Sequence, residues 1–96
     1  MEKHQVRDVV LGVLREVQKI SGREWSKPGP DDQPIGALVG FDSLSGIEAT
    51  VMMASELGCD LGTDSIFVSA DGKRALTLDE IALRVGEIVS AKGVTA

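Results

Sequence analysis

Hydrophobic residues recur at steps of three and four along three stretches of the chain, which is the period of an amphipathic helix. The first stretch covers residues 6–20, and its opposite side is charged. Its apolar positions are Val6, Val9, Val10, Val13, Leu14, Val17 and Ile20. Glycine often takes the left-handed conformation that ends a helix. We therefore expect a first helix that ends at Ser21-Gly22.

The second stretch predicts a helix from Ser43 to Leu57, followed by Gly58 as a stop. Its apolar positions are Leu44, Ile47, Val51, Ala54 and Leu57. Asp42 can cap this helix by accepting from the free amides of its first turn. A second start is also open, because Ser45-Gly46-Ile47-Glu48 matches a capping box with Ser45 as the N-cap. Either start leaves Ser43 at the helix entrance.

The third stretch opens with Thr77-Leu78-Asp79-Glu80, which is a capping box, and predicts a helix ending near Lys92-Gly93. Its apolar face comprises Leu78, Ile81, Ala82, Val85, Ile88 and Val89. Amphipathic helices of this kind can bury their apolar faces only against each other. The pattern therefore predicts an all-helical bundle.

The segments between these helices are less regular. Residues 23–40 carry three prolines and predict a long ordered loop with a short turn at residues 35–39. The expected anchors of this loop are Trp25, Ile35, Leu38, Val39 and Phe41. Residues 63–68 are expected to form a short third helical turn capped by Thr63 or Asp64, and Asp71-Gly72-Lys73-Arg74 a mobile surface insertion. A hairpin turning at Asp71-Gly72 is the open alternative.

Composition narrows the class of protein. The chain has 96 residues, which is enough for one domain, and its net charge is −5. This charge argues against nucleic acid or an anionic membrane as partner. Cys59 is the only cysteine, and no apolar run approaches the length of a membrane span. We expect a soluble, unprocessed, cytoplasmic monomer.

Ser43 is the candidate for chemistry, because a helix entrance favours negative charge. A phosphodiester on its hydroxyl would be stabilised there by the helix dipole and the unpaired amides. The site would then serve a covalent modification.

Asp42-Ser43-Leu44 at the start of the second helix resembles the motif of the acyl carrier protein family, including peptidyl carrier domains. The order of elements is similar too. The resemblance implies an all-α four-helix bundle with a long loop between its first two helices. It also implies 4′-phosphopantetheine on Ser43, carrying acyl or aminoacyl groups as thioesters, with Asp42 helping to hold magnesium in the complex with the modifying enzyme.

The resemblance further implies partners and the surface that meets them. A phosphopantetheinyl transferase would modify the chain with coenzyme A and Mg²⁺, and acyl-loading and acyl-processing enzymes would use it. The expected contact residues are Leu44, Ile47, Glu48, Val51 and Glu56. Leu44 is expected to be exposed, with Ile47 and Val51 partly in the core. The second helix has only two acids, which points away from bulk fatty-acid synthesis toward a specialised fatty-acid, polyketide or related pathway.

A second function class stays open. The chain could be an unmodified, carrier-like module for protein interaction. A small hydrolase built on Ser43 is not expected, because a Gly-x-Ser-x-Gly elbow is missing and His4, the only histidine, falls in the N-terminal tail. The acidic residues do not match a calcium loop either. We therefore expect no catalysis by the chain itself and no bound metal.

Overall fold

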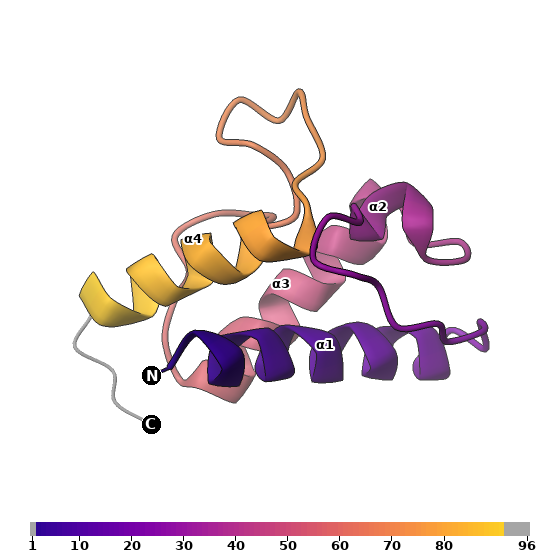
Figure 1. Ribbon diagram of the computed structural model, residues 1–96, viewed down its shortest axis with the longest axis horizontal. Coiled ribbons are helices and arrows are strands. Elements are labelled where there is room, and N and C mark those ends of the chain that lie inside the picture. The colour runs from indigo at the N-terminus through magenta and orange to yellow at the C-terminus, as the bar shows by residue number, and fades with distance from the viewer. Residues whose placement is uncertain (1, 92–96) are drawn as a thin grey trace.

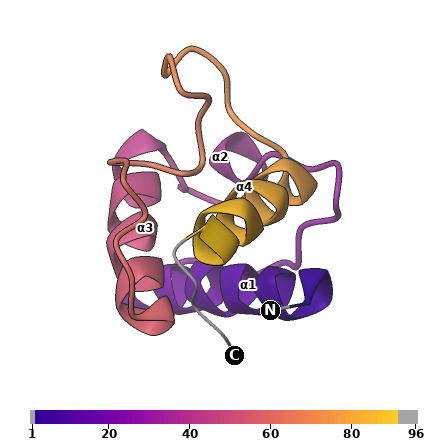
Figure 2. The ribbon, with the colours of Figure 1, turned by 90° about the vertical axis from the view of Figure 1, so that its left-hand side faces the viewer.

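The computed structural model describes residues 2–91, apart from the side chain of Lys3. Its three long helices are α1 (Lys3–Ile20), α3 (Ser43–Leu57) and α4 (Leu78–Ala91), and α2 (Pro34–Ala37) is a single short turn (Figure 1). Helix α1 packs against both α3 and α4. Figure 2 shows α4 lying over α1, with α3 along one side of the pair. The predicted all-helical bundle is confirmed.

The helix boundaries follow the predicted caps. Helix α1 ends before Ser21, and α3 runs from Ser43 to Leu57 as expected. At the start of α4, Thr77 N donates to Glu80 Oε1 at 2.9 Å and Glu80 N donates to Thr77 Oγ1 at 3.2 Å, so the capping box is formed. The predicted end near Lys92-Gly93 lies outside the described residues. No helix among residues 2–91 is long and apolar enough to cross a membrane.

The core draws on all three long helices and on the segments between them. Phe41 and Phe67 meet edge to face, with ring centroids 5.5 Å apart. Two expected core residues remain outside: Ile20 is 71% exposed and Val39 is 54% exposed. Ile20 is the last residue of α1, where no described element covers its side chain. Trp25 and Ile35 are half-buried, whereas Leu38 and Phe41 are buried loop anchors.

The long loop, residues 23–40, is held by hydrogen bonds as well as by apolar anchors. Gln18, a buried polar residue of α1, donates its amide to Val39 O at 2.7 Å and to Glu24 O at 3.3 Å. The first two amides of α4, Leu78 N and Asp79 N, donate to Asp32 O and Pro30 O of the loop at 2.8 and 3.0 Å. The loop is therefore fastened to α1 and to α4.

The prediction of a short helix at residues 63–68 is wrong. Val68 pairs with Ala75 in an isolated antiparallel bridge, and Leu76 N donates to Phe67 O at 2.9 Å. Tertiary contacts override the local caps, because Ile66 N donates to Thr50 Oγ1 of α3 at 3.1 Å. Ile66 and Phe67 are both fully buried. The hairpin alternative describes this segment better.

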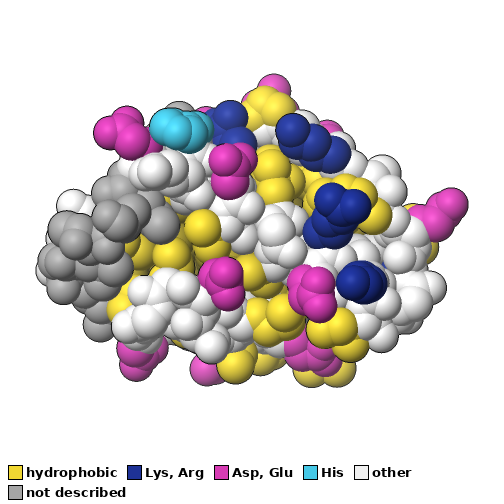
Figure 3. Space-filling model, turned by 90° about the horizontal axis from the view of Figure 1, so that it is seen from below, with side chains coloured by type: hydrophobic (Ala, Val, Ile, Leu, Met, Phe, Trp, Pro, Cys, Tyr) yellow, Lys and Arg dark blue, Asp and Glu magenta, His cyan; other side chains and the backbone are white. Residues whose placement is uncertain are grey.

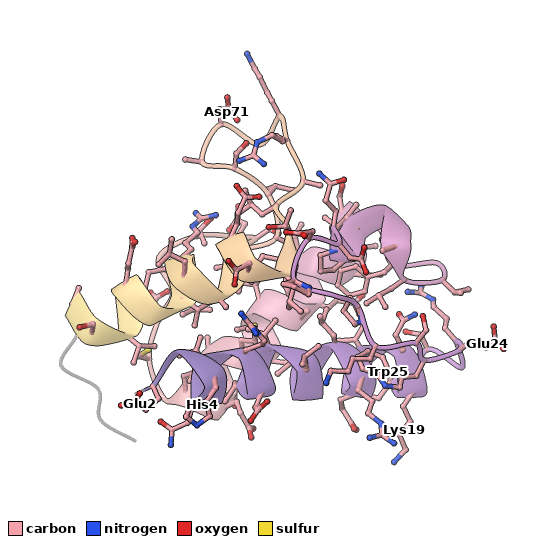
Figure 4. All side chains as sticks on the ribbon, viewed as in Figure 1. Glu2, His4, Lys19, Glu24, Trp25 and Asp71 are labelled. Atoms are coloured by element: carbon pink, nitrogen blue, oxygen red, sulfur yellow. The ribbon has the colours of Figure 1, made fainter. Side chains whose placement is uncertain are left out.

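The turn of this hairpin spans residues 69–74 and projects from the bundle, with Asp71 near its tip (Figure 4). Gly72 N donates to Ser69 O at 2.8 Å, and Asp71 Oδ1 accepts from Lys73 N at 3.0 Å. These bonds, together with one between Ser69 N and Arg74 O at 2.8 Å, close the turn. The expected insertion is thus a hydrogen-bonded turn.

Replacing Gly72 with valine is expected to lower the free energy of unfolding by about 1–2 kcal/mol. Gly72 has φ 73°, a left-handed conformation that β-branched residues disfavour. A Cβ atom there would meet nothing within 4 Å, so the cost lies in the backbone alone. Urea denaturation measures the effect. Ala70→Val in the same exposed turn is the control and should change little; equal stability of both variants would show that the turn relaxes freely.

Candidate functional site

The entrance of α3 is built around Asp42, which is its N-cap. Asp42 Oδ1 accepts from Ser45 N at 3.0 Å and from the Ser45 hydroxyl at 3.1 Å. These two hydrogen bonds, with a smaller contribution from the Arg23 charge, lower the pKa of Asp42. The alternative start at Ser45 is wrong, because Ser45 lies buried inside the first turn of the helix.

Arg23 supports this entrance from the other end of the long loop. Its Nη1 donates to Ser45 Oγ at 3.0 Å, so Arg23, Ser45 and Asp42 form one chain of hydrogen bonds. Gly40, with φ 67°, makes room for it: a Cβ atom on Gly40 would lie 2.9 Å from Arg23 Nε. Sequence reasoning missed Arg23, and only the glycine just before Phe41 hinted that something passes close to the backbone there.

Ser43 is the first residue of α3 and is exposed. It stands at the edge of a groove of about 350 Å³ between α3 and the segment that leads into the hairpin. The residues lining this groove are Ser43, Ile47, Thr63, Asp64, Ser65, Val68, Ser69, Ala70, Asp71 and Gly72. A group attached to the Ser43 hydroxyl therefore has a partly polar channel beside it.

Next to Ser43, α3 carries an exposed apolar strip. Leu44, Ile47 and Val51 are 64%, 41% and 66% exposed. The exposure of Leu44 is as predicted, but the expectation that Ile47 and Val51 are partly in the core is wrong. The face of α3 turned to the core carries mainly smaller residues, Ser45, Gly46, Ala49, Thr50, Met53 and Leu57. Gly46 allows Ser65 to pack close to the helix, because a Cβ atom there would lie 3.2 Å from Ser65 Oγ, and it also lies over Phe67.

The two acids of α3 do not share one face. Glu48 is exposed and lies four residues, about one helical turn, after Leu44, so it borders the apolar strip. Glu56 lies twelve residues after Leu44, which at 100° per residue turns it about 120° away from that leucine. It lines a different groove, between α3 and α1. The structure thus brings Asp42, Ser43, Leu44, Ile47, Glu48 and Val51 together and separates Glu56 from them.

His4 and Cys59 do not line the groove beside Ser43. His4 belongs to the first turn of α1, and not to a tail as expected, and is labelled beside Glu2 at the N-terminal end of that helix (Figure 4). Among residues 2–91, no group of three or more His, Cys, Asp or Glu side chains is placed to hold a metal ion. Cys59 is a free, half-buried thiol. The entrance of α3 presents the accessible hydroxyl of Ser43 at the start of a capped helix.

No family model, curated protein or solved structure matches this chain. The geometry of the α3 entrance is therefore the ground for a functional conclusion: an all-helical protein that presents a serine at a helix N-terminus, beside an apolar strip.

Proposed function

We propose that the protein is an acyl carrier protein, modified on Ser43 with 4′-phosphopantetheine and carrying acyl or aminoacyl groups as thioesters. The observation that carries this proposal is the placement of Ser43: an exposed hydroxyl at the first position of α3, directly after the capping residue Asp42. The chain would hold a reactive group and leave the chemistry to separate enzymes. The pantetheine thiol would supply the thioester linkage.

The electrostatics of the α3 entrance support a phosphodiester at Ser43. A helix of 15 residues carries partial positive charge at its N-terminus, which favours an anion attached to its first residue. The guanidinium of Arg23 adds a full positive charge two hydrogen bonds from Asp42. Because Asp42 is held by Ser45, the first turn is ordered before any modification takes place.

The surroundings of Ser43 support recognition by a modifying enzyme. Leu44, Ile47 and Val51 form a strip that a transferase or a partner enzyme can cover, and Glu48 can meet a basic residue at its border. Only Glu48 of the two acids lies there, which supports a specialised pathway over bulk fatty-acid synthesis. The groove beside Ser43 would receive the first part of the arm.

Intact mass spectrometry tests the proposal. Incubation with a broad-specificity phosphopantetheinyl transferase, coenzyme A and Mg²⁺ should add one phosphopantetheine mass per chain. An unmodified interaction module, the second candidate, has the same exposed strip but would gain no mass. Complete absence of the addition, with a known carrier modified in the same tube, would reject the carrier function.

Leu44→Ala is expected to lower the kcat/KM of modification by about tenfold, which corresponds to about 1.4 kcal/mol of lost interaction at a central contact residue. Because Leu44 is exposed, this substitution should lower the protein's free energy of unfolding by less than about 1 kcal/mol. Truncation of a buried leucine costs about 2–5 kcal/mol. Leu83→Ala is the matched control, since Leu83 is 57% exposed on α4. A large drop in the Tm of Leu44→Ala, or equal kinetic losses in both variants, would contradict the docking role.

A further inference from the structure

A second groove, of about 490 Å³, lies between α1 and the C-terminal half of α3. Its lining residues are Asp8, Val9, Gly12, Val13, Glu16, Met52 and Glu56. We propose that this groove, named here the α1/α3 groove, docks a basic amphipathic helix of a partner protein. The inference does not depend on the modification of Ser43.

The floor of the α1/α3 groove is apolar and adaptable. Val9 and Met52 are half-buried members of the core's outer layer, and their remaining surface faces the groove. A flexible thioether such as that of Met52 can adjust to different apolar side chains. An amphipathic helix could lay its apolar face on this floor, in the manner of a helix bound in a hydrophobic groove.

Gly12 opens the floor. It lies in the middle of α1, where glycine is less favourable than alanine, yet a Cβ atom at this position would meet nothing within 4 Å. Packing against the rest of the chain therefore does not require glycine. Because Gly12 has no side chain, the floor has a notch at this position, into which a partner's side chain can insert.

The negative charge around the α1/α3 groove favours a basic partner. Asp8 and Glu16 of α1 and Glu56 of α3 place three carboxylates around the apolar floor. None of the three forms an ion pair with another residue of the described chain. From below, Figure 3 shows acidic side chains beside hydrophobic atoms across the middle of the surface, with Lys and Arg gathered toward one end. Carboxylates at both walls attract lysine and arginine, and they repel an acidic segment.

The α1/α3 groove is distant from the Ser43 entrance. The two α3 residues that line the groove, Met52 and Glu56, come nine and thirteen positions after Ser43, which corresponds to about 14 and 20 Å along α3 at 1.5 Å per residue. A partner seated in the α1/α3 groove would leave Ser43 accessible. The protein could then be held by one protein while a second acts at Ser43.

The test uses a synthetic amphipathic peptide of lysine and leucine, about 18 residues long so that it can form a helix on binding. Its control replaces every lysine with glutamate. Titration into ¹⁵N-labelled protein, both wild type and Ser43→Ala, should shift the amide resonances of Val9, Gly12 and Met52 with the lysine peptide only. Binding should weaken as salt is raised. Shifts centred on Leu44, Ile47 and Val51 instead would overturn the proposal.

Two variants and one control separate the α1/α3 groove from general charge attraction. Glu16→Lys with Glu56→Lys should weaken peptide binding at least about tenfold. Gly12→Leu should abolish binding by filling the notch, while its Tm stays equal or rises, because leucine favours a helix.

The control, Glu24→Lys with Glu87→Lys, makes the same change in net charge at exposed positions outside the groove and should retain binding. Equal loss in the control, or undiminished binding by Gly12→Leu, would show that the groove is not the site. Concentration-dependent shifts without peptide would identify a second copy as the occupant and likewise overturn the proposal.

Discussion

Ser43→Ala is expected to abolish the gain of phosphopantetheine mass completely, because alanine lacks the hydroxyl oxygen that would form the phosphodiester. The substitution should leave the fold intact, since Ser43 is exposed and alanine is the best helix former. Intact mass after incubation with transferase, coenzyme A and Mg²⁺ gives the result directly, and circular dichroism verifies that the helices remain.

Two other serines of α3 serve as controls for this prediction. Ser55 is exposed but lies in the C-terminal half of the helix, and Ser45 is buried with its hydroxyl bonded to Asp42 and Arg23. Ser55→Ala and Ser45→Ala should both keep the mass gain. A gain that persists in Ser43→Ala and disappears in Ser45→Ala would move the attachment site to Ser45 and refute the assignment made here.

Phe67→Ala is expected to lower the free energy of unfolding by about 3–5 kcal/mol. Domains of this size are stable by about 5–15 kcal/mol, so the loss would be a large share of the total. Phe67 is fully buried, meets Phe41 edge to face and lies beneath Gly46 of α3. Its removal would leave a cavity between the hairpin and the helix that carries Ser43. Urea denaturation followed by circular dichroism measures the change.

Ile20→Ala is the contrasting variant. Ile20 is a large apolar residue that the sequence pattern assigned to the core, but it is 71% exposed at the end of α1. Its truncation should cost less than about 1 kcal/mol. If Ile20→Ala were as damaging as Phe67→Ala, the described packing at the end of α1 would be incorrect.

The helix boundaries could be predicted because their signals are local. Thr77 and Glu80 lie three residues apart and cap each other, and Asp42 lies three residues before the amide that it accepts from. The position of Ser43 at the α3 entrance followed from the same local signals. Both partners of each such contact lie within a few consecutive residues of the sequence.

The buried face of α3 could not be predicted in the same way. Periodicity gives weight to large apolar side chains, so it assigned Ile47 and Val51 partly to the core. The structure instead turns Gly46, Ala49 and Thr50 inward, because small residues let the segment at Ser65 approach the helix closely. The large apolar residues that remain outside are the ones that define the strip beside Ser43.

Contacts between distant residues explain the other misses. Thr50 accepts from the amide of Ile66, 16 residues further on, and helps to fix residues 63–68 outside a helix. Arg23 reaches Ser45, 22 residues away, through the space left by Gly40. Neither partner can be identified from local spacing, because each contact exists only once the bundle has folded.

The hydrogen bonds between the long loop and α4 have a consequence for cooperativity. Asp32 O and Pro30 O accept from the first two amides of α4, so this helix relies on the loop for part of its N-terminal capping. Local detachment of the loop would leave these two amides without their hydrogen-bond acceptors. Unfolding of the first turn of α4 would in turn break the hydrogen bonds that hold the loop. The irregular segment that leads to Ser43 therefore opens together with the last helix, as one cooperative unit of the fold.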